Sequence, residues 1–248
     1  MTMHDEGREV LAECLDTSGV CERLSRDLLS NGDFAAMIAK EAPALRLLTD
    51  EEQRESLRHM LSIRPAGDAW IFAYGSLIWN PAIHIVEQRR ARIVGWHRSF
   101  CLSAIAGRGS PENPGLVLGL DEGGHCDGVA LRLPEDSIEA ELTLLWRREM
   151  VAGAYIPRWV DLVGTDGEVF GSGIAFTMDR TASVYAGGLQ RAITIQRLAT
   201  ASGSIGSSAE YLFRTRDGLR TLGIEDDEIE RLAEDVEQAQ SAALPPSV

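Results

Sequence analysis

The sequence lacks any long hydrophobic run. No apolar stretch approaches the roughly 18 residues needed to span a bilayer, and residues 1–10 are polar and acidic, unlike a secretory signal. Basic residues are also scarce, with 24 Lys and Arg against 38 Asp and Glu and a formal net charge of −14. This charge disfavours a nucleic acid as partner. We therefore expect a soluble, cytoplasmic protein that acts on a small molecule and binds neither nucleic acid nor membrane, with its oligomeric state left open.

Cysteine and histidine are sparse, and the common catalytic motifs are absent. There is no His-Glu-x-x-His, no Gly-x-Ser-x-Gly, no phosphate loop and no Gly-x-Gly-x-x-Gly. The cysteines include no Cys-x-x-Cys pair and are too few for a disulfide framework, and the histidines lack the spacing of a metal site. These residues are Cys14, Cys21, Cys101, Cys126, His4, His59, His84, His97 and His125. We expect reduced thiols, structural or surface histidines and no metal.

The sequence pattern of the first part of the chain predicts helices. Residues 5–60 show no strand-like alternation, and Thr49 followed by Glu52 has the pattern of a capping box at a helix start. Two helix breakers with flanking charges at 64–68 mark a connection. We therefore predict three parts. They are a helical N-terminal extension over 1–68, a core domain over 69–241 and a flexible tail over 242–248.

The sequence pattern of the core domain predicts mainly strands. Short stretches rich in β-branched and aromatic residues alternate with Gly, Pro, Asn and Asp. The expected strands are 70–74, 91–102, 115–120, 128–133, 155–163 and 173–178, and the expected helices are 135–150, 183–200, 208–222 and 226–240. Strands joined by short turns favour a small mixed or antiparallel sheet that closes towards a barrel. We expect an α+β fold with helices flanking that sheet.

The helix expected at 135–150 carries a carboxylate on its apolar face. At about 100° per residue, Glu149 falls within roughly 40° of Leu142 and Leu145 around the helix axis, whereas Arg147 falls on the opposite side, where charged residues usually face water. Burying an unpaired carboxylate costs several kcal/mol, so Glu149 must be paired, be protonated or line a cavity. Geometry alone leaves open a catalytic role, a structural ion pair with an arginine, or a helix end that frees the side chain.

A second candidate is the run Tyr74, Gly75, Ser76 and Leu77, directly after an apolar strand. Glycine and serine at a strand end let the backbone turn sharply and expose N–H groups suited to a carboxylate or a developing oxyanion. A simple turn has the same sequence pattern.

Arg108 is the third candidate, in a Gly- and Pro-rich loop at 107–115. It is suited to bind a substrate carboxylate through two hydrogen bonds, and an exposed loop arginine is the alternative.

Several blocks of sequence then follow one another in the order found in a known family. They are 70–81, 94–100, 107–109 with 114–115, 128–130 with 132–134, 145–150 with Tyr155, and 210–213. Together they resemble the ChaC-like γ-glutamylcyclotransferases, and the helical extension resembles that of bacterial members. The segment 151–154 departs from branches that are shorter or richer in glycine there.

The resemblance implies a glutathione-specific γ-glutamylcyclotransferase, a lyase of glutathione catabolism that forms 5-oxoproline and cysteinylglycine without metal or organic cofactor. It implies that 69–241 is the catalytic domain, that Glu149 is the catalytic carboxylate and that residues 74–77 cradle the substrate. It also places Tyr155 and Tyr211 near the pocket.

The expected chemistry is an intramolecular cyclisation, because the α-amine of a γ-glutamyl group can reach its own γ-carbonyl. The enzyme must fold the substrate, move a proton from the ammonium to the leaving amine and stabilise an oxyanion. Two alternatives stay open. One is a cyclotransferase for γ-glutamyl-amines or γ-glutamyl-amino acids, and the other is a non-catalytic ligand-binding regulator linked to cation transport. A core-facing carboxylate argues against the second, since a pure binder has no need of it.

Overall fold

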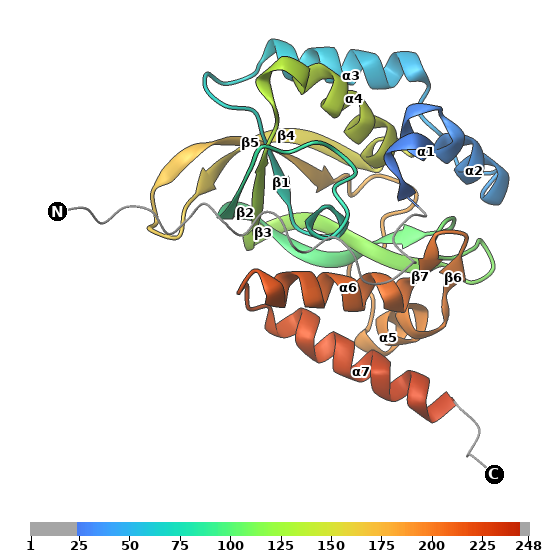
Figure 1. Cartoon of the computed structure of the whole chain (residues 1–248). Coiled ribbons are helices and arrows are strands. Elements are labelled where there is room, and N and C mark those ends of the chain that lie inside the picture. Colours follow the sequence, from blue (N-terminus) through green and yellow to red (C-terminus); the bar gives the residue numbers. More distant parts are fainter. Residues whose placement is uncertain (1–23, 244–248) are drawn as a thin grey trace.

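The computed structural model of the chain describes residues 24–243 (Figure 1). Five strands form a closed barrel in the order β1-β3-β2-β4-β5, with a further pairing of β3 and β5. The strands are β1 (Trp70–Ala73), β2 (Glu87–Ala104), β3 (Gly115–Arg132), β4 (Tyr155–Val163) and β5 (Val169–Met178). β1 runs antiparallel to β3 and parallel to β5, so the sheet is mixed. The predicted α+β fold with a barrel-like mixed sheet is confirmed.

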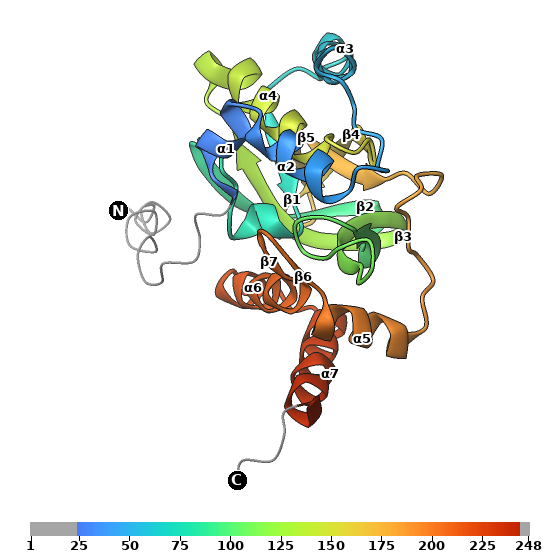
Figure 2. The same cartoon turned by 90° about the vertical axis from the view of Figure 1, so that its right-hand side faces the viewer.

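Helices cover the barrel on two sides (Figures 1 and 2). α3 and α4 lie over one side, α5, α6 and α7 lie over the other, and α1 and α2 pack beside α4. The helices are α1 (Arg26–Ser30), α2 (Asp33–Glu41), α3 (Asp50–Ser62), α4 (Ile138–Glu149), α5 (Arg191–Thr200), α6 (Ser208–Thr221) and α7 (Asp227–Ala243). Two short strands, β6 (Ser202–Gly203) and β7 (Gly206–Ser207), form a hairpin between α5 and α6.

The predicted capping box begins α3. The Thr49 hydroxyl accepts from Glu52 N at 3.2 Å, and the Glu52 carboxylate accepts from Thr49 N at 2.8 Å. α7 continues to Ala243, so the predicted tail is helical at 242–243. Cys14, Cys21, His4, residues 1–23 of the predicted extension and residues 244–248 of the predicted tail lie outside the described part of the chain. The boundary predicted between residues 68 and 69 stays a prediction.

The two strands predicted at 115–120 and 128–133 are wrong as separate elements, because β3 is continuous across both. Gly123 and Gly124, with φ of 106° and 67°, do not end the strand. They lie opposite a register shift in β2, between Val94 and Trp96, where Gly95 has a φ of 89°. Glycine adopts these positive φ angles at little cost, so the long hairpin bends there instead of stopping.

The helix predicted at 183–200 is also wrong in its first half, because α5 begins only at Arg191. The preceding segment pairs with the edge of β2 instead. Ser103 N donates to Val184 O at 2.8 Å, Ala186 N donates to Cys101 O at 2.8 Å, and Tyr185 bridges Leu102. These β-type hydrogen bonds with an existing strand replace the helical ones that the apolar spacing predicts.

The apolar face of α4 is packed against the barrel and against α3. Leu142, Leu145 and Trp146 are buried, and burying side chains of this size contributes about 1.5–3 kcal/mol each. The Trp146 ring packs edge-on against the Phe176 ring, with 5.3 Å between the ring centres, and Trp146 Nε1 donates to Ser56 Oγ at 3.1 Å. This packing fixes the end of α4 against the barrel. Among residues 24–243, no helix combines the length and the apolar character that crossing a membrane requires.

Candidate active site

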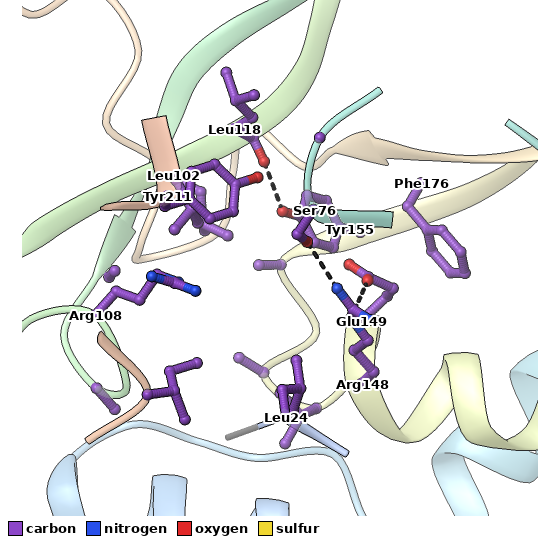
Figure 3. Close-up of a pocket in the computed structure, with 18 of the residues that line it drawn as sticks. Leu24, Ser76, Leu102, Arg108, Leu118, Arg148, Glu149, Tyr155, Phe176 and Tyr211 are labelled. Carbon is purple, nitrogen blue, oxygen red and sulfur yellow. Dashed lines mark hydrogen bonds and ion pairs between the residues drawn. The ribbon is translucent and has the colours of Figure 1, made fainter. Parts of the chain in front are cut away.

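One cavity of about 200 Å³ gathers all eight candidate site residues (Figure 3). It lies beside the ends of β1 and α4 and next to the N-terminal helices. The candidates that line it are Tyr74, Gly75, Ser76, Leu77, Arg108, Glu149, Tyr155 and Tyr211. Residues from five separate parts of the sequence thus meet at one place. No group of three or more His, Cys, Asp or Glu side chains in the region 24–243 is arranged to bind a metal ion.

Glu149 is the last residue of α4 and turns its carboxylate towards the cavity (Figure 3). Its side chain is 14% exposed, and Oε1 forms an ion pair with Nε of Arg148 at 3.0 Å. Burial raises the pKa of Glu149, and the charge and hydrogen bonding of Arg148 oppose that rise. Two of the open interpretations therefore hold together, since the carboxylate is paired with an arginine and also lines a cavity. A raised pKa brings a carboxylate closer to the range where it exchanges protons with an amine.

Arg148 is a site residue that sequence reasoning missed. Its side chain is 4% exposed. Nη2 donates to Ser76 Oγ at 2.8 Å and Nη1 donates to Asn80 O at 2.6 Å. One guanidinium group therefore joins Glu149 to the loop that follows β1. The available signal was its place beside Glu149 in the last turn of an amphipathic helix.

Arg147 also differs from expectation, since it does not simply face water. Its Nη1 donates to the carbonyls of Leu29, at 3.2 Å, and Ser30. It therefore supplies donors to the carbonyl groups at the end of α1, as basic side chains often do at helix C-termini.

The candidate loop leaves β1 through Gly75 and enters the short 3₁₀ helix η2 (Ser76–Ile78). Ile78 N donates to Gly75 O at 2.9 Å, and Asn80 N donates to Ser76 O at 2.8 Å. A Cβ atom at Gly75 would lie 2.7 Å from the hydroxyl of Tyr211. Only glycine allows the loop to approach α6 this closely.

Three buried tyrosines line the same cavity as the carboxylate. Tyr74 Oη donates to Phe176 O at 3.0 Å, and Tyr155 Oη donates to Leu118 O at 2.9 Å. Burial raises the pKa of Tyr74, Tyr155 and Tyr211, and the neighbouring charge of Glu149 adds to this for each of them. All three phenols therefore stay protonated near neutral pH.

Arg108 is not an exposed loop arginine, so that alternative is wrong. The residue is 9% exposed, and Nη1 donates to Ser207 O at 2.9 Å. Its guanidinium lies over the rings of Tyr211, at 5.4 Å, and Trp79, at 5.7 Å. Burial lowers its pKa, yet an arginine keeps its charge under such conditions.

A third arginine, Arg214, lines the cavity beside Arg108 and Arg148, and it was also missed by sequence reasoning. Its Nε lies 3.1 Å from Glu210 Oε1, and its guanidinium lies 5.3 Å from the centre of the Trp79 ring. Nη1 of Arg108 lies 3.6 Å from the other oxygen of the same carboxylate. Two guanidinium groups thus share one carboxylate, which leaves one positive charge in excess at this end of the cavity. Its sequence signal was the spacing of four between Glu210 and Arg214 in a helix.

Comparisons with known proteins identify the family of this chain. A family model described as ChaC-like protein matches residues 69–239. The glutathione-specific γ-glutamylcyclotransferase of Escherichia coli (strain K12) is 41% identical over 226 residues, which cover 91% of this chain and 97% of that protein. The match to this relative therefore reaches well into the sequence before residue 69. The γ-glutamylcyclotransferase 2-1 of Arabidopsis thaliana is 30% identical over 67% of this chain and 81% of its own length.

A solved structure shares the fold. The crystal structure of a yeast γ-glutamyl cyclotransferase specific to glutathione superposes with a TM-score of 0.64, at 19% sequence identity, over 72% of this chain and all of that chain. At this identity the likeness concerns the fold alone. The family model and the relative from Escherichia coli, which each match most of the chain, show that it belongs to the ChaC-like protein family.

Proposed function

We propose that the protein cleaves glutathione by cyclising its γ-glutamyl group, which yields 5-oxoproline and cysteinylglycine. The observation that carries this proposal is the Glu149 carboxylate, which lines a cavity together with the Ser76 loop and a buried arginine, Arg108. Membership of the ChaC-like family and the names of the relatives support glutathione as substrate. A cytoplasmic location and a small molecule as the partner belong to the same proposal.

In this reaction the substrate carries its own nucleophile. The α-amine, once it has lost a proton to Glu149, attacks the γ-carbonyl carbon and closes a five-membered ring. Glu149 returns the proton to the cysteine nitrogen as the bond from that nitrogen to the carbon breaks. The ring nitrogen then gives its remaining extra proton to the same carboxylate, which passes it to the freed amine, so that 5-oxoproline keeps one lactam N–H and cysteinylglycine leaves as an ammonium. A single carboxylate can serve these transfers if its pKa lies closer to that of an amine than an exposed glutamate's does. Burial shifts the pKa of Glu149 in this direction.

The other candidate residues would bind and orient the substrate. The backbone N–H groups of Gly75, Ser76 and Leu77 are proposed to hold either the α-carboxylate or the developing oxyanion. Arg108 is proposed to bind the carboxylate at the glycine end of the tripeptide, because an excess positive charge lies there on an otherwise acidic protein.

The ring faces of Tyr74, Tyr155 and Tyr211 would enclose the substrate. The carbonyl hydrogen bonds of Tyr74 and Tyr155 hold these two rings in place. Enclosure of this kind excludes water and strengthens electrostatic contacts inside the cavity.

The test is to incubate the purified protein with glutathione and measure 5-oxoproline. Glu149→Gln should reduce the rate by about 10²–10⁴-fold, the range that a general base or acid contributes. Glu139→Gln removes an exposed carboxylate from the same helix, and it should keep the wild-type rate. Equal release by wild type and Glu149→Gln would show that this carboxylate is not the base.

The choice of substrate needs a panel of γ-glutamyl compounds. Reduced glutathione should be cleaved with a higher kcat/KM than γ-Glu-Ala, γ-Glu-ε-Lys and oxidised glutathione. Preference for γ-Glu-Ala or γ-Glu-ε-Lys would favour the cyclotransferase for amino acids or amines instead. Tight binding of glutathione with no 5-oxoproline released would favour the ligand-binding regulator.

A further inference from the structure

The side of the cavity formed by the N-terminal extension is apolar. Leu24, Phe34, Ile38 and Leu45 line the same cavity as Glu149. Figure 3 shows Leu24 on the side of the N-terminal helices, well separated in this view from Tyr211. The extension thus contributes a wall of the candidate active site instead of only covering an edge of the barrel.

This wall is attached to the segments that carry the site residues. Three hydrogen bonds join the extension to the loop after η2, to the loop of Arg108 and to the segment after Glu149. They run from Asn80 Nδ2 to Leu24 O at 3.1 Å, from Gly107 N to Glu41 Oε2 at 2.8 Å, and from Leu48 N to Val151 O at 2.9 Å. The wall therefore has a fixed position relative to Glu149 and Arg108.

A partly buried ion pair holds α1 against α4 as well. Nη1 and Nη2 of Arg26 donate to the two carboxylate oxygens of Glu141, at 2.6 and 2.8 Å, and the Glu141 side chain is almost fully buried. His84 N donates to the same carboxylate at 3.0 Å. A bidentate contact of this kind fixes orientation as well as distance.

The distribution of polarity around the cavity decides how a substrate lies in it. A γ-glutamyl group carries an amine and a carboxylate, and each must find polar partners because burying it without one is costly. Glu149, Ser76 and Arg108 offer such partners, and the wall of the extension offers none among Leu24, Phe34, Ile38 and Leu45. An apolar part of the substrate is what fits against that wall.

We propose that α2 is the specificity wall for the leaving half of the substrate, with Phe34 and Ile38 packing against the side chain of the residue joined to the γ-glutamyl group. These two residues are four apart, and hence lie on one face of α2. They favour a small apolar group, such as the CH₂–SH of cysteine, over a larger or charged one. This inference rests on the proposed function, and it assigns a role to the N-terminal extension.

The test compares glutathione with S-methylglutathione, which adds one carbon at the sulfur atom. The quantity measured is the ratio of the two kcat/KM values for 5-oxoproline release, because loss of folded protein cancels in that ratio. Wild type should discriminate against the methylated compound, and Ile38→Ala and Phe34→Leu should each relax the ratio by about tenfold, the lower end of what one methylene group changes in a packed pocket. Ile38→Val removes less volume and should shift the ratio in the same direction by less.

The matched control is Leu29→Ala. Leu29 is a buried leucine of the extension that does not line the cavity, so its variant should lose stability and keep the wild-type ratio. Wild-type ratios in both cavity variants, or no discrimination by wild type, would overturn the specificity wall. If wild type releases no 5-oxoproline from glutathione or from S-methylglutathione, the proposed function itself is overturned, so the two failures can be told apart.

Discussion

The close approach of the Ser76 loop to α6 makes a quantitative prediction about Gly75. In Gly75→Ala, the new Cβ atom would lie 2.7 Å from Tyr211 Oη, whereas its next neighbours, two carbon atoms of Leu118, lie at ordinary contact distances of 3.5 and 3.6 Å. The Tyr211 ring cannot move aside easily, because Trp79 and Phe100 contact it edge-on with ring centres 6.0 and 6.1 Å away. Forcing extra volume into such a site costs about 1–3 kcal/mol.

A double-mutant cycle isolates that clash. Tyr211→Phe deletes only the oxygen atom that the new Cβ meets, so the double variant Gly75→Ala with Tyr211→Phe should be more stable than the sum of the two single effects predicts. The coupling should be about 1–3 kcal/mol in favour of the double variant. The effect that alanine has on the backbone conformation at position 75 is present in both the single variant Gly75→Ala and the double variant, so it cancels in the coupling energy.

Urea unfolding of the four proteins measures the coupling, provided that their m-values agree. A clash between the new Cβ atom and Tyr211 Oη is excluded if the two substitutions add within about 0.5 kcal/mol, which is the behaviour of independent sites. Release of 5-oxoproline gives a second readout. We expect Gly75→Ala to reduce kcat/KM for glutathione, and the double variant to recover part of that loss because the loop returns towards its native position.

Three further predictions concern charge and protonation. Replacing Arg148 by Met removes the cation that opposes the rise of the Glu149 pKa. Glu149 should then lose its proton only at higher pH, so the acidic limb of the kcat/KM profile against pH should move to higher pH. An acidic limb at the wild-type pH would contradict this. Arg108→Met should raise KM for glutathione, with loss of about 1.5–3 kcal/mol of binding free energy. KM for γ-Glu-Cys, which lacks the glycine carboxylate, should be much less affected. Equal increases in KM for the two substrates would exclude a contact between Arg108 and that carboxylate. Burial raises the pKa of Cys101 to about 12 and that of Cys126 to about 11, so iodoacetamide at pH 8 should leave both unmodified in the folded protein, as peptide mass mapping would reveal.

Local sequence pattern predicted most elements of the fold and the central carboxylate. Glu149 was found because a helix has a fixed period and a charge on its apolar face stands out. The capping box at Thr49 was found for a similar reason, since its two residues lie one turn apart. The failures at 121–127 and 183–190 have a different origin. Both segments form hydrogen bonds with β2. The glycines near 123 suggested a strand end and the apolar spacing near 183 suggested a helix, and neither local pattern reveals pairing with a distant strand.

The partners of the site residues were beyond local pattern. Arg148 contacts Ser76 and Asn80, which lie about 70 residues earlier in the chain. The contacts of the N-terminal extension are also remote in sequence, since Gly107 lies 66 residues after Glu41 and Val151 lies 103 residues after Leu48. Periodicity shows which way a side chain points from its own element, but it carries no information about which distant segment lies opposite.

The pairing of β1 has a consequence for the order in which the protein can fold during synthesis. Within residues 24–243, β1 pairs only with β3 and β5, and its parallel partner β5 ends at Met178. A chain that emerges from the ribosome therefore holds β1 without a partner until β3 appears, and the barrel cannot close until β5 has followed. The cavity is complete only when Arg214 of α6 has been added. Prematurely ended chains lacking α6 would leave uncovered the side of β3 on which α6 packs and would have an open cavity. They should therefore be substrates for proteolysis and should not be partially active enzymes.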